Sequence, residues 1–301
     1  MRKLLLALLV LLLALTAAGC GGDDDDGDST APPTNPPATG SDVSCLKDDL
    51  ELITPGKLTI ATDNPAFPPW FEGAEKNDPW DPTTAPTKKG YEAEVAYAVA
   101  EQLGFADTDV VWKVAPFNTL FRPGAKDFDF DLNQVSFSEE RANAVGFSDS
   151  YYDVEQALVS AKGSKVAGAK SLADVKDAKL GAQIGTTSYD TITEIVAPGP
   201  KPQVYDSNND AISALKAKQI DGIVVDYPTS LYMAAVQIPG GTVVGRLPRL
   251  ESAGEHFGLV TEKGSSLIPC LNRAVSALRE DGTLDRLEQK WIVGSAPPVL
   301  E

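Results

Sequence analysis

Short apolar runs alternate with stretches of helical periodicity through most of the chain. Leu58–Thr62 is a run of aliphatic and β-branched residues, typical of a buried strand. After Gly90, apolar residues recur at four-residue spacing up to Gly104, as they do on one face of a helix that a glycine ends. The same reasoning predicts strands at 110–114 and 128–132, and a helix at 139–144 that begins after Ser138.

A second series of the same kind begins near Glu155. Patterns of the form Ser/Thr-x-x-Asp predict helix starts capped by Thr187 and by Ser207. Apolar residues recur with helical spacing again from Leu267 to Leu278. Further strands are predicted at 157–160, 180–184, 222–226, 242–244 and 257–260. Strands that alternate with helices in this way predict an α/β fold.

The first residues predict a targeting segment. Residues 1–20 read MRKLLLALLVLLLALTAAGC, in which two basic residues precede an apolar run shorter than the roughly 20 residues of a spanning helix. We therefore expect a signal peptide at 1–19, with an uncleaved membrane anchor as the alternative. The closing letters AAGC resemble the lipobox of bacterial lipoproteins, which implies that Cys20 becomes the acylated mature N-terminus.

Residues 20–44 are expected to form a disordered tether. Gly, Asp, Pro and Thr dominate this segment, so it buries too little apolar surface to offset the entropy of ordering. The Asp23–Asp26 run could be read as a calcium site, but no ligand spacing follows it. An acidic linker kept extended by self-repulsion is the better interpretation.

Composition and charge exclude several classes of protein. The 301 residues allow about two compact units. With 26 Lys+Arg against 43 Asp+Glu, the formal net charge is −17, which opposes nucleic-acid binding because that needs a basic surface. The single histidine, His256, excludes a metal site of several histidines, and no CxxC pair is present for a zinc ribbon. We expect no metal and no cofactor.

Two cysteines remain once Cys20 is acylated. Cys45 and Cys270 lie near the two ends of the predicted folded region, in a compartment where disulfides persist. We predict that they form a disulfide; two buried free thiols are the alternative.

Five segments in order resemble the family 3 solute-binding proteins, the amino-acid receptors of bacterial ABC importers. The resemblance implies the two-lobe periplasmic-binding-protein fold of type II, an α/β architecture with two crossover hinge strands and the ligand between the lobes. Lobe 1 would comprise 45–153 plus 255–301, and lobe 2 would comprise 154–254. The segments are TDNPAFPPW (62–70), GYEAEV (90–95), FDFDLNQVSFSEERANAVGFSDSYY (128–152), QIGTTSYD (183–190) and DGIVVDYP (221–228).

The resemblance also implies which residues bind the charged groups of a free amino acid. Arg141 would bind the α-carboxylate, because a guanidinium offers it two parallel hydrogen bonds. Asp226, at the end of a predicted strand, would bind the ammonium. The alternatives are a surface pair between Arg141 and Glu139 or Glu140, and a loop cap by Asp226 before Pro228.

Eight further contacts are implied. Hydroxyls at a strand end and at a helix start would bind the carboxylate, since a helix N-terminus favours an anion. A backbone carbonyl would accept from the ammonium, three aromatic rings would enclose the ligand side chain, and an acid would face its polar group. Each type has a plainer interpretation as a cap, an exposed side chain or part of the core. In that order, the residues are Ser136, Thr187 and Thr186; Gln134; Phe67, Trp70 and Phe117; and Asp63.

These observations predict an extracytoplasmic receptor that acylated Cys20 anchors to the cell membrane. It would bind a free, polar amino acid as a monomer and deliver it to an ABC permease and its ATPase. The alternative is an enzyme on the same fold, a dehydratase or lyase that acts on a small carboxylic acid. Such chemistry needs a general acid or base, for which only Glu155 and Glu194 stand out.

Overall fold

The computed structural model describes residues 43–72, 88–249, 255–292 and 297–301. The predicted signal peptide, Cys20 and nearly all of the predicted tether lie outside these ranges. Their expected roles therefore stay predictions. Every helix in the described ranges is too short or too polar to cross a membrane.

The first of two five-stranded sheets is mixed. Its inner strand β1 pairs in parallel with both neighbours, whereas β10 pairs antiparallel with the strand on each side of it. In spatial order the strands are β2 (Val110–Val114), β1 (Leu58–Thr62), β3 (Phe130–Asp131), β10 (His256–Glu262) and β4 (Val145–Asp153).

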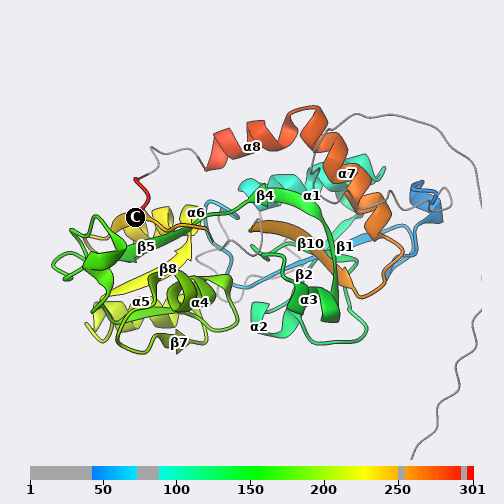
Figure 1. Cartoon of the computed structure of the whole chain (residues 1–301). Coiled ribbons are helices and arrows are strands. Elements are labelled where there is room, and N and C mark those ends of the chain that lie inside the picture. Colours follow the sequence, from blue (N-terminus) through cyan, green and yellow to red (C-terminus); the bar gives the residue numbers. More distant parts are fainter. Residues whose placement is uncertain (1–42, 73–87, 250–254, 293–296) are drawn as a thin grey trace, which may run out of the picture. The chain divides into compact units, whose positions relative to one another are not determined.

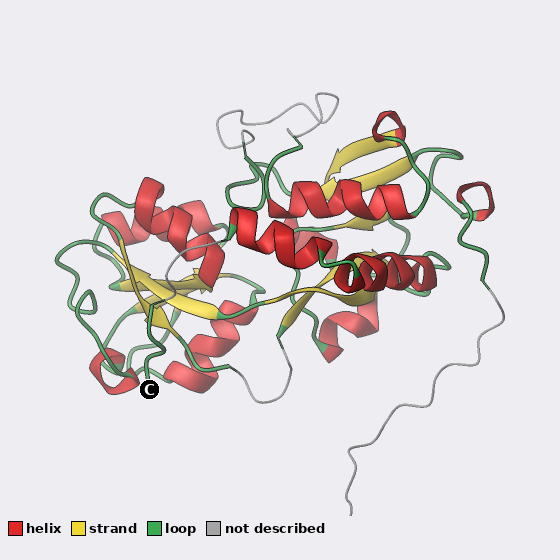
Figure 2. Ribbon diagram, turned by 90° about the horizontal axis from the view of Figure 1, so that it is seen from above, coloured by secondary structure: helices red, strands yellow, loops and turns green. Residues whose placement is uncertain are grey.

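Helices cover both faces of this sheet. α1 (Tyr91–Gln102), α7 (Ile268–Glu280) and α8 (Thr283–Trp291) share one apolar core with β1, β3 and β10. All three helices lie on the same side of the sheet (Figure 1). Figure 2 looks down on these three helices. The shorter α2 (Phe117–Leu120) and α3 (Glu139–Ala144) lie on the other side. Parallel strands need such crossover connections, which explains the alternation in the sequence.

The second sheet repeats the same plan. β6 pairs in parallel with both neighbours, and the last two strands again run antiparallel. α4 (Thr187–Thr191), α5 (Asn208–Lys216) and α6 (Tyr227–Tyr232) follow its strands. In spatial order these strands are β7 (Gln203–Tyr205), β6 (Leu180–Gln183), β8 (Gly222–Asp226), β5 (Gln156–Ser160) and β9 (Thr242–Arg246). We call the units built on the first and second sheets lobe 1 and lobe 2; the expected two-lobe α/β fold is confirmed.

Several predicted elements occur at the expected residues, including β1, β2, β8 and α3. Ser138 caps α3, since its hydroxyl accepts a hydrogen bond from the Arg141 N–H at 3.2 Å. The strand predicted at 128–132 is shorter than expected, because only Phe130–Asp131 pairs. β4, β7, α2 and α6 had no prediction; β4 in particular mixes buried and exposed residues without strict alternation.

Gly90 fixes the approach of α1 to the preceding loop. Its φ of 115° lies in the region that only glycine adopts readily, and a Cβ there would lie 2.2 Å from the carbonyl oxygen of Trp70. The aromatic ring of Trp70 in turn packs edge-on against Tyr91, Tyr152 and Phe257, at 5.6–5.9 Å between ring centroids. This close packing joins α1 to the strands that lead toward lobe 2.

The last described residues return to lobe 2. Residues 297–301 were expected in lobe 1, but Val299 pairs with Arg246 of β9 and Leu300 is 0% exposed in the lobe 2 core. The Leu300 side chain occupies the space over Gly245, which has no side chain of its own. The boundary expected from the sequence is therefore wrong for this segment, because one buried leucine carries no pattern that assigns it to a lobe.

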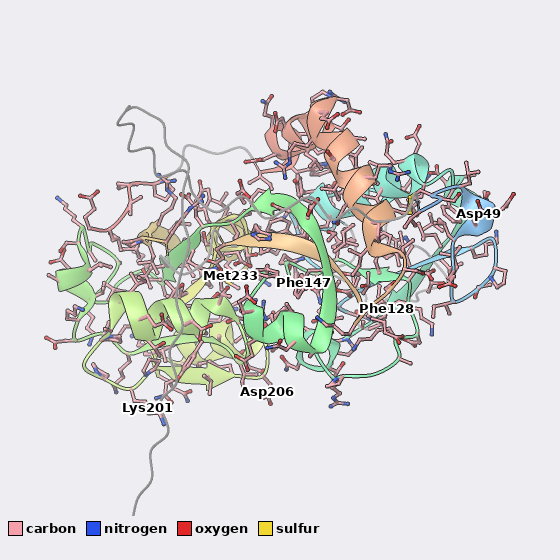
Figure 3. The ribbon with its side chains drawn as sticks, turned by 45° about the vertical axis from the view of Figure 1, so that its right-hand side comes forward. Asp49, Phe128, Phe147, Lys201, Asp206 and Met233 are labelled. Atoms are coloured by element: carbon pink, nitrogen blue, oxygen red, sulfur yellow. A yellow bond between two sulfur atoms is a disulfide. The ribbon has the colours of Figure 1, made fainter. Side chains whose placement is uncertain are left out.

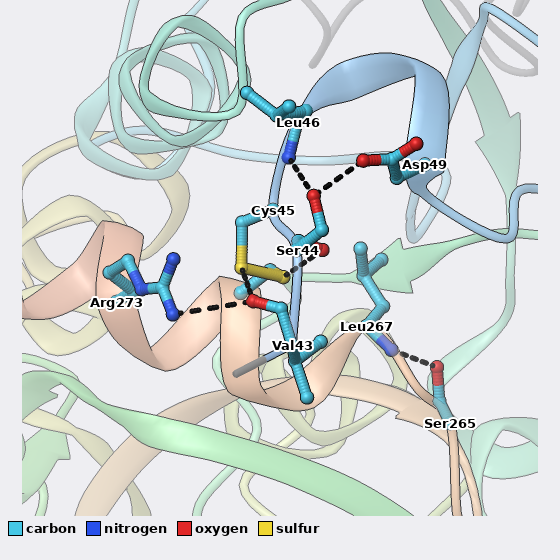
Figure 4. The surroundings of a disulfide bond; sticks show 9 residues. Val43, Ser44, Cys45, Leu46, Asp49, Ser265, Leu267 and Arg273 are labelled. Carbon is cyan, nitrogen blue, oxygen red and sulfur yellow. Dashed lines mark hydrogen bonds between the residues drawn. A yellow bond between two sulfur atoms is a disulfide. The ribbon is translucent and has the colours of Figure 1, made fainter. Parts of the chain in front are cut away.

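The predicted disulfide is confirmed. Cys45 and Cys270 are joined, with 5.4 Å between their Cα atoms. The bond links the segment before β1 to α7, so both cysteines belong to lobe 1 (Figure 4). Next to it, Arg273 donates a hydrogen bond to the Val43 carbonyl at 3.5 Å, which adds a second link between the same segments.

Candidate ligand-binding site

A cavity of about 280 Å³ lies between residues of both lobes, close to the smallest size usual for small-molecule sites. Carboxyl ends of parallel strands in both sheets contribute to it, which is where open α/β sheets place ligands. Lobe 2 also contributes Asp206 and Met233 (Figure 3). The structure brings together all ten side chains singled out in the sequence: Asp63, Phe67, Trp70, Phe117, Gln134, Ser136, Arg141, Thr186, Thr187 and Asp226.

Hydrogen bonds join the two lobes beside this cavity. Trp70 Nε1 donates to Thr229 Oγ1 at 2.9 Å. Asn118 Nδ2 donates to the Asp206 carbonyl at 3.0 Å. Each bond pairs a lobe 1 side chain with a lobe 2 group, so the relative placement of the cavity walls depends on these contacts.

Arg141 is a half-buried cation at the start of α3. Its guanidinium donates to the Ser136 carbonyl at 2.5 Å and to the Gly185 carbonyl, in lobe 2, at 2.7 Å. The group also lies 4.6 Å from the Phe121 ring centre. Within the described part of the chain no carboxylate forms an ion pair with it. The alternative of a surface pair on its own helix is therefore wrong.

Burial lowers the pKa of Arg141, because desolvation disfavours its charged form. A cation held in this way is stabilised by an anion that enters the cavity.

Asp226 ends β8 and faces the same cavity. Gln156 Nε2 donates to its Oδ1 at 2.7 Å. Burial, followed by the charge of Glu255, raises the pKa of Asp226 to about 8. Asp226 occupies the N-cap position of α6, but its side chain makes no capping hydrogen bond. The loop-cap alternative therefore does not explain it, and a cation that replaces the proton would.

The hydroxyls at the start of α4 differ from the prediction. Thr186 is the N-cap residue and Thr187 is the first helical residue, so the expected cap at Thr187 is wrong. The Thr187 hydroxyl donates instead to Glu255 and lies 3.2 Å from the Ser136 hydroxyl. The Thr186 hydroxyl donates to the Gln183 carbonyl at 2.7 Å.

Gln134 is held by a buried acid behind the cavity wall. Its N–H donates to Glu92 Oε1 at 2.8 Å, and its side-chain amide donates to Glu92 Oε2. Tyr151 donates to the same carboxyl at 2.5 Å. Burial raises the pKa of Glu92 to about 7, although these three donors lower it. The expected role of the Gln134 carbonyl toward an ammonium stays a prediction.

Aromatic side chains from both lobes line the cavity. Phe67 and Tyr232 face each other across the lobes with ring centres 6.1 Å apart. Phe117 packs edge-on against Phe121 at 5.5 Å. Trp70 is only 1% exposed, so most of its ring belongs to the lobe 1 core. Tyr232 had no signal in the sequence, because it lies within a helix that the sequence did not predict.

Asp63 is a second acid that lines the cavity. It accepts hydrogen bonds from the N–H groups of Asn64 and Phe117, at 2.7 and 3.4 Å. Burial raises its pKa, while these donors and Asn133 lower it. The Asp63 carboxylate is therefore a hydrogen-bond acceptor, and a donor group on a ligand would further stabilise its charged form.

Asp131 is a carboxyl group buried in the lobe 1 sheet. It is 0% exposed on β3, and neither of its oxygens has a hydrogen-bond partner among the described residues. Burial raises its pKa well above the usual value, and the charges of Glu92 and Asp63 raise it further. The charge of Lys126 acts in the opposite direction and lowers this pKa. The protonated form is thus favoured in the folded protein.

We expect Asp131→Leu to raise the free energy of unfolding by about 1–3 kcal/mol, since a buried polar group without partners destabilises the fold. Because the folded pKa is raised, the stability that the acid contributes at low pH is lost as pH rises from about 4. The gain should therefore be larger at pH 8 than at pH 5 in urea unfolding. Asp131→Asn keeps a buried polar group but cannot ionise, so it should gain less than the Leu variant at both pH values and show the same increase in gain from pH 5 to pH 8. A Leu variant less stable than the wild type at pH 8 would contradict this account.

The sequence analysis did not single out three further residues at the site. Glu255, Gln156 and Ser188 form a buried hydrogen-bonded group next to the cavity, in which Ser188 donates to Gln156 at 2.7 Å and Gln156 donates to Glu255 at 2.9 Å. Gln156 follows directly on the lobe crossing, and a polar residue at the start of an otherwise apolar strand was the one available signal.

Comparison with known proteins supports this description of the fold. The family model described as bacterial extracellular solute-binding proteins, family 3, matches residues 58–294. The arginine-binding extracellular protein ArtP of Bacillus subtilis (strain 168) is 27% identical over 208 residues, or 68% of this chain and 78% of ArtP. The L-cystine-binding protein TcyJ of Escherichia coli (strain K12) is 30% identical over 206 residues, or 67% of this chain and 73% of TcyJ.

A solved structure of an ancestral arginine-binding protein bound to glutamine is also similar. Its TM-score is 0.62 at 30% identity, and the match covers 78% of this chain and 97% of that one. The relatives thus bear names of amino acids with different side chains.

Proposed function

Because the chain belongs to the bacterial extracellular solute-binding proteins of family 3, we propose that it binds a free, polar L-amino acid between its lobes and delivers it to an ABC importer. The curated relatives are solute-binding proteins named for amino acids. The observation that carries the proposal is Arg141, a cation that lines the cavity and has no carboxylate partner in the described part of the chain. A ligand carboxylate would supply that partner.

The charged groups of an amino acid match the cavity. Arg141 is the charged donor for the carboxylate, and backbone N–H groups at the start of α4, beside Thr186, add to it. The hydroxyls of Ser136 and Thr187 line the same place, and on binding they would turn their single protons from Glu255 to the ligand carboxylate. Asp226 supplies the anion for the ammonium, which would replace the proton that burial favours on this acid. Both charges of the ligand would therefore be compensated.

The remaining lining residues would enclose the ligand side chain. Phe67, Phe117 and Trp70 contribute apolar walls, and Asp63 offers a carboxylate to a donor group. The Gln134 backbone completes the wall near the ammonium. A polar side chain with a hydrogen-bond donor fits this combination better than an aliphatic one.

The proposal includes the cellular setting. The receptor would act as a monomer outside the cytoplasm, held at the cell membrane by acyl chains on Cys20 and the acidic tether, with an ABC permease and its ATPase as partners. Two acyl chains are enough for stable anchoring.

We propose binding without chemistry. Of the two acids considered for an enzyme, Glu155 forms an ion pair with Arg246 at 2.5 Å and faces a different cavity. Neither Glu155 nor Glu194 is among the described residues that line the ligand cavity. The acids that do line the cavity, Asp226 and Asp63, would pair with donor groups of the ligand, so the site would release its ligand unchanged.

A thermal-shift panel tests this function. The twenty amino acids, cystine and ornithine are each added to the secreted protein, and a ligand at 100 times its Kd should stabilise the fold by about 2.7 kcal/mol. Mass spectrometry of the ligand after incubation should find it intact. No shift with any compound would refute amino-acid binding, and recovery of a product would favour the enzyme.

The anchor has a separate test. We expect Cys20→Ala to move the protein from the membrane fraction to the soluble fraction, because the acylated residue is lost, while affinity for the ligand stays within twofold. Fractionation followed by immunoblotting measures the first effect. Cys45→Ala, which leaves Cys20 in place, should remain with the membrane. Retention of the Cys20 variant would indicate an uncleaved anchor.

A further inference from the structure

The carboxylate of Glu255 receives hydrogen bonds from both lobes. Ser136, in lobe 1, donates to its Oε1 at 3.3 Å. Thr187 and Gln156, in lobe 2, donate to the same oxygen, Gln156 at 2.9 Å. Glu255 itself lies directly before β10, where the chain re-enters lobe 1. One acid thus holds groups of both lobes at the crossing.

Glu255 is not among the residues that line the cavity, and its side chain is almost fully buried, with 4% exposed. A buried carboxylate is expensive unless donors satisfy it, and three side chains do so here. The charge of Arg141 lowers the pKa of both Glu255 and its neighbour Asp226, whereas the charge of Glu92 raises the pKa of Asp226. Gln156 Nε2 donates to both acids, so a single amide links them.

We propose that Glu255 is a positioning residue of the ligand site. It fixes the Ser136 and Thr187 side chains at the carboxylate end by accepting their hydroxyl protons. Its charge also disfavours charge on Asp226 at the ammonium end, with which it shares the Gln156 amide. This inference rests on the proposed amino-acid binding and adds a residue that acts behind the cavity wall. It predicts that both ends of the ligand site respond when one acid outside the cavity is changed.

The link between the two acids has a measurable consequence. The Glu255 charge raises the pKa of Asp226, and the Gln156 hydrogen bond lowers it. In the ligand-free protein Asp226 therefore carries a proton up to about pH 8. An ammonium that binds there displaces this proton. Below pH 8 the affinity should therefore increase by up to about tenfold for each unit by which the pH is raised.

The experiment compares the secreted wild type with Glu255→Gln by calorimetry, with L-arginine as the probe, from pH 5.5 to 8.5 in buffers of different ionisation enthalpy. The wild type should release about 0.9 proton per ligand at pH 7, as expected for a group with a pKa near 8. In Glu255→Gln this number should fall below that of the wild type, and the bend in the affinity profile should move to lower pH, because the charge that opposes ionisation of Asp226 is gone.

Two further variants make the result specific. Gln156→Met removes the hydrogen bond that favours charge on Asp226, so the bend should move to higher pH, opposite to Glu255→Gln. Glu262→Gln, at the exposed far end of β10, should leave the profile unchanged. A general loss of structure would not shift the bend in opposite directions. If the wild type binds L-arginine but neither variant moves the bend, the role of Glu255 is refuted and the binding function stands.

A ligand-free measurement decides the case if L-arginine does not bind. An acid whose pKa is higher in the folded than in the unfolded protein makes the fold less stable as pH rises, because its proton is then lost more easily from the unfolded chain. The free energy of unfolding of the wild type should therefore fall between pH 5 and 8. Glu255→Gln should lose clearly less, and Glu262→Gln should match the wild type. Equal losses in all three would overturn the inference, whereas failure of every amino acid in the thermal-shift panel would refute the proposed function.

Discussion

Replacing Arg141 by lysine is expected to weaken the affinity for the amino-acid ligand by about a hundredfold, or about 2.7 kcal/mol, while the protein still folds. The guanidinium already donates to the Ser136 and Gly185 carbonyls and lies against Phe121, so its plane is fixed before a ligand arrives. A lysine ammonium keeps the charge but loses that plane and the parallel hydrogen bonds to a carboxylate.

Isothermal calorimetry measures this effect with the tightest ligand of the thermal-shift panel. Arg122→Lys is the matched control, because Arg122 is an exposed arginine of the same lobe outside the cavity lining. The analogue of the ligand that lacks its α-carboxylate should bind wild type and Arg141→Lys with similar affinity. An unchanged affinity for the intact amino acid would remove Arg141 from the carboxylate site.

Removal of the disulfide is the change with the largest expected effect on stability. The double variant Cys45→Ala, Cys270→Ala should lower the free energy of unfolding by about 2–5 kcal/mol. The reason is the length of the closed loop: the cysteines are 225 residues apart, so the bond removes much conformational freedom from the unfolded chain.

Guanidinium unfolding of the oxidised wild type, the reduced wild type and the double variant measures the difference. The reduced wild type should resemble the double variant, and reductant should not affect the latter. Ligand affinity should change little at 25 °C, because neither cysteine is among the described residues that line the cavity. Equal midpoints for oxidised and reduced protein would show that the bond does not stabilise the fold.

Local patterns explain why much of the fold could be predicted. β1 is a run of five buried residues, and α3 begins directly after a serine whose hydroxyl caps it. Such signals depend on the residue and its near neighbours in the chain. β4 and α6 escaped prediction because their sequences follow no single period, and packing against the rest of each lobe determines their conformation.

The candidate site was predictable where a motif places a residue at the end of a strand or the start of a helix. Asp63 follows a buried strand, Asp226 ends another, and Thr186 and Thr187 stand at the start of α4, so the topology carries them to the cavity. Their hydrogen bonds were not predictable. Thr187 bonds to Glu255, a partner 68 residues away whose position depends on how the chain crosses between the lobes.

The sequence alone therefore determined the alternation of strands and helices, the pair of cysteines available for a disulfide, and the motifs that carry the resemblance to a family of solute-binding proteins. Tertiary structure alone decided that Glu255 contacts both lobes, that Asp131 lies buried without a partner, and that Leu300 returns to lobe 2. The physical reason is that propensity and periodicity are local, whereas burial and the meeting of distant side chains follow from the packing of the whole chain.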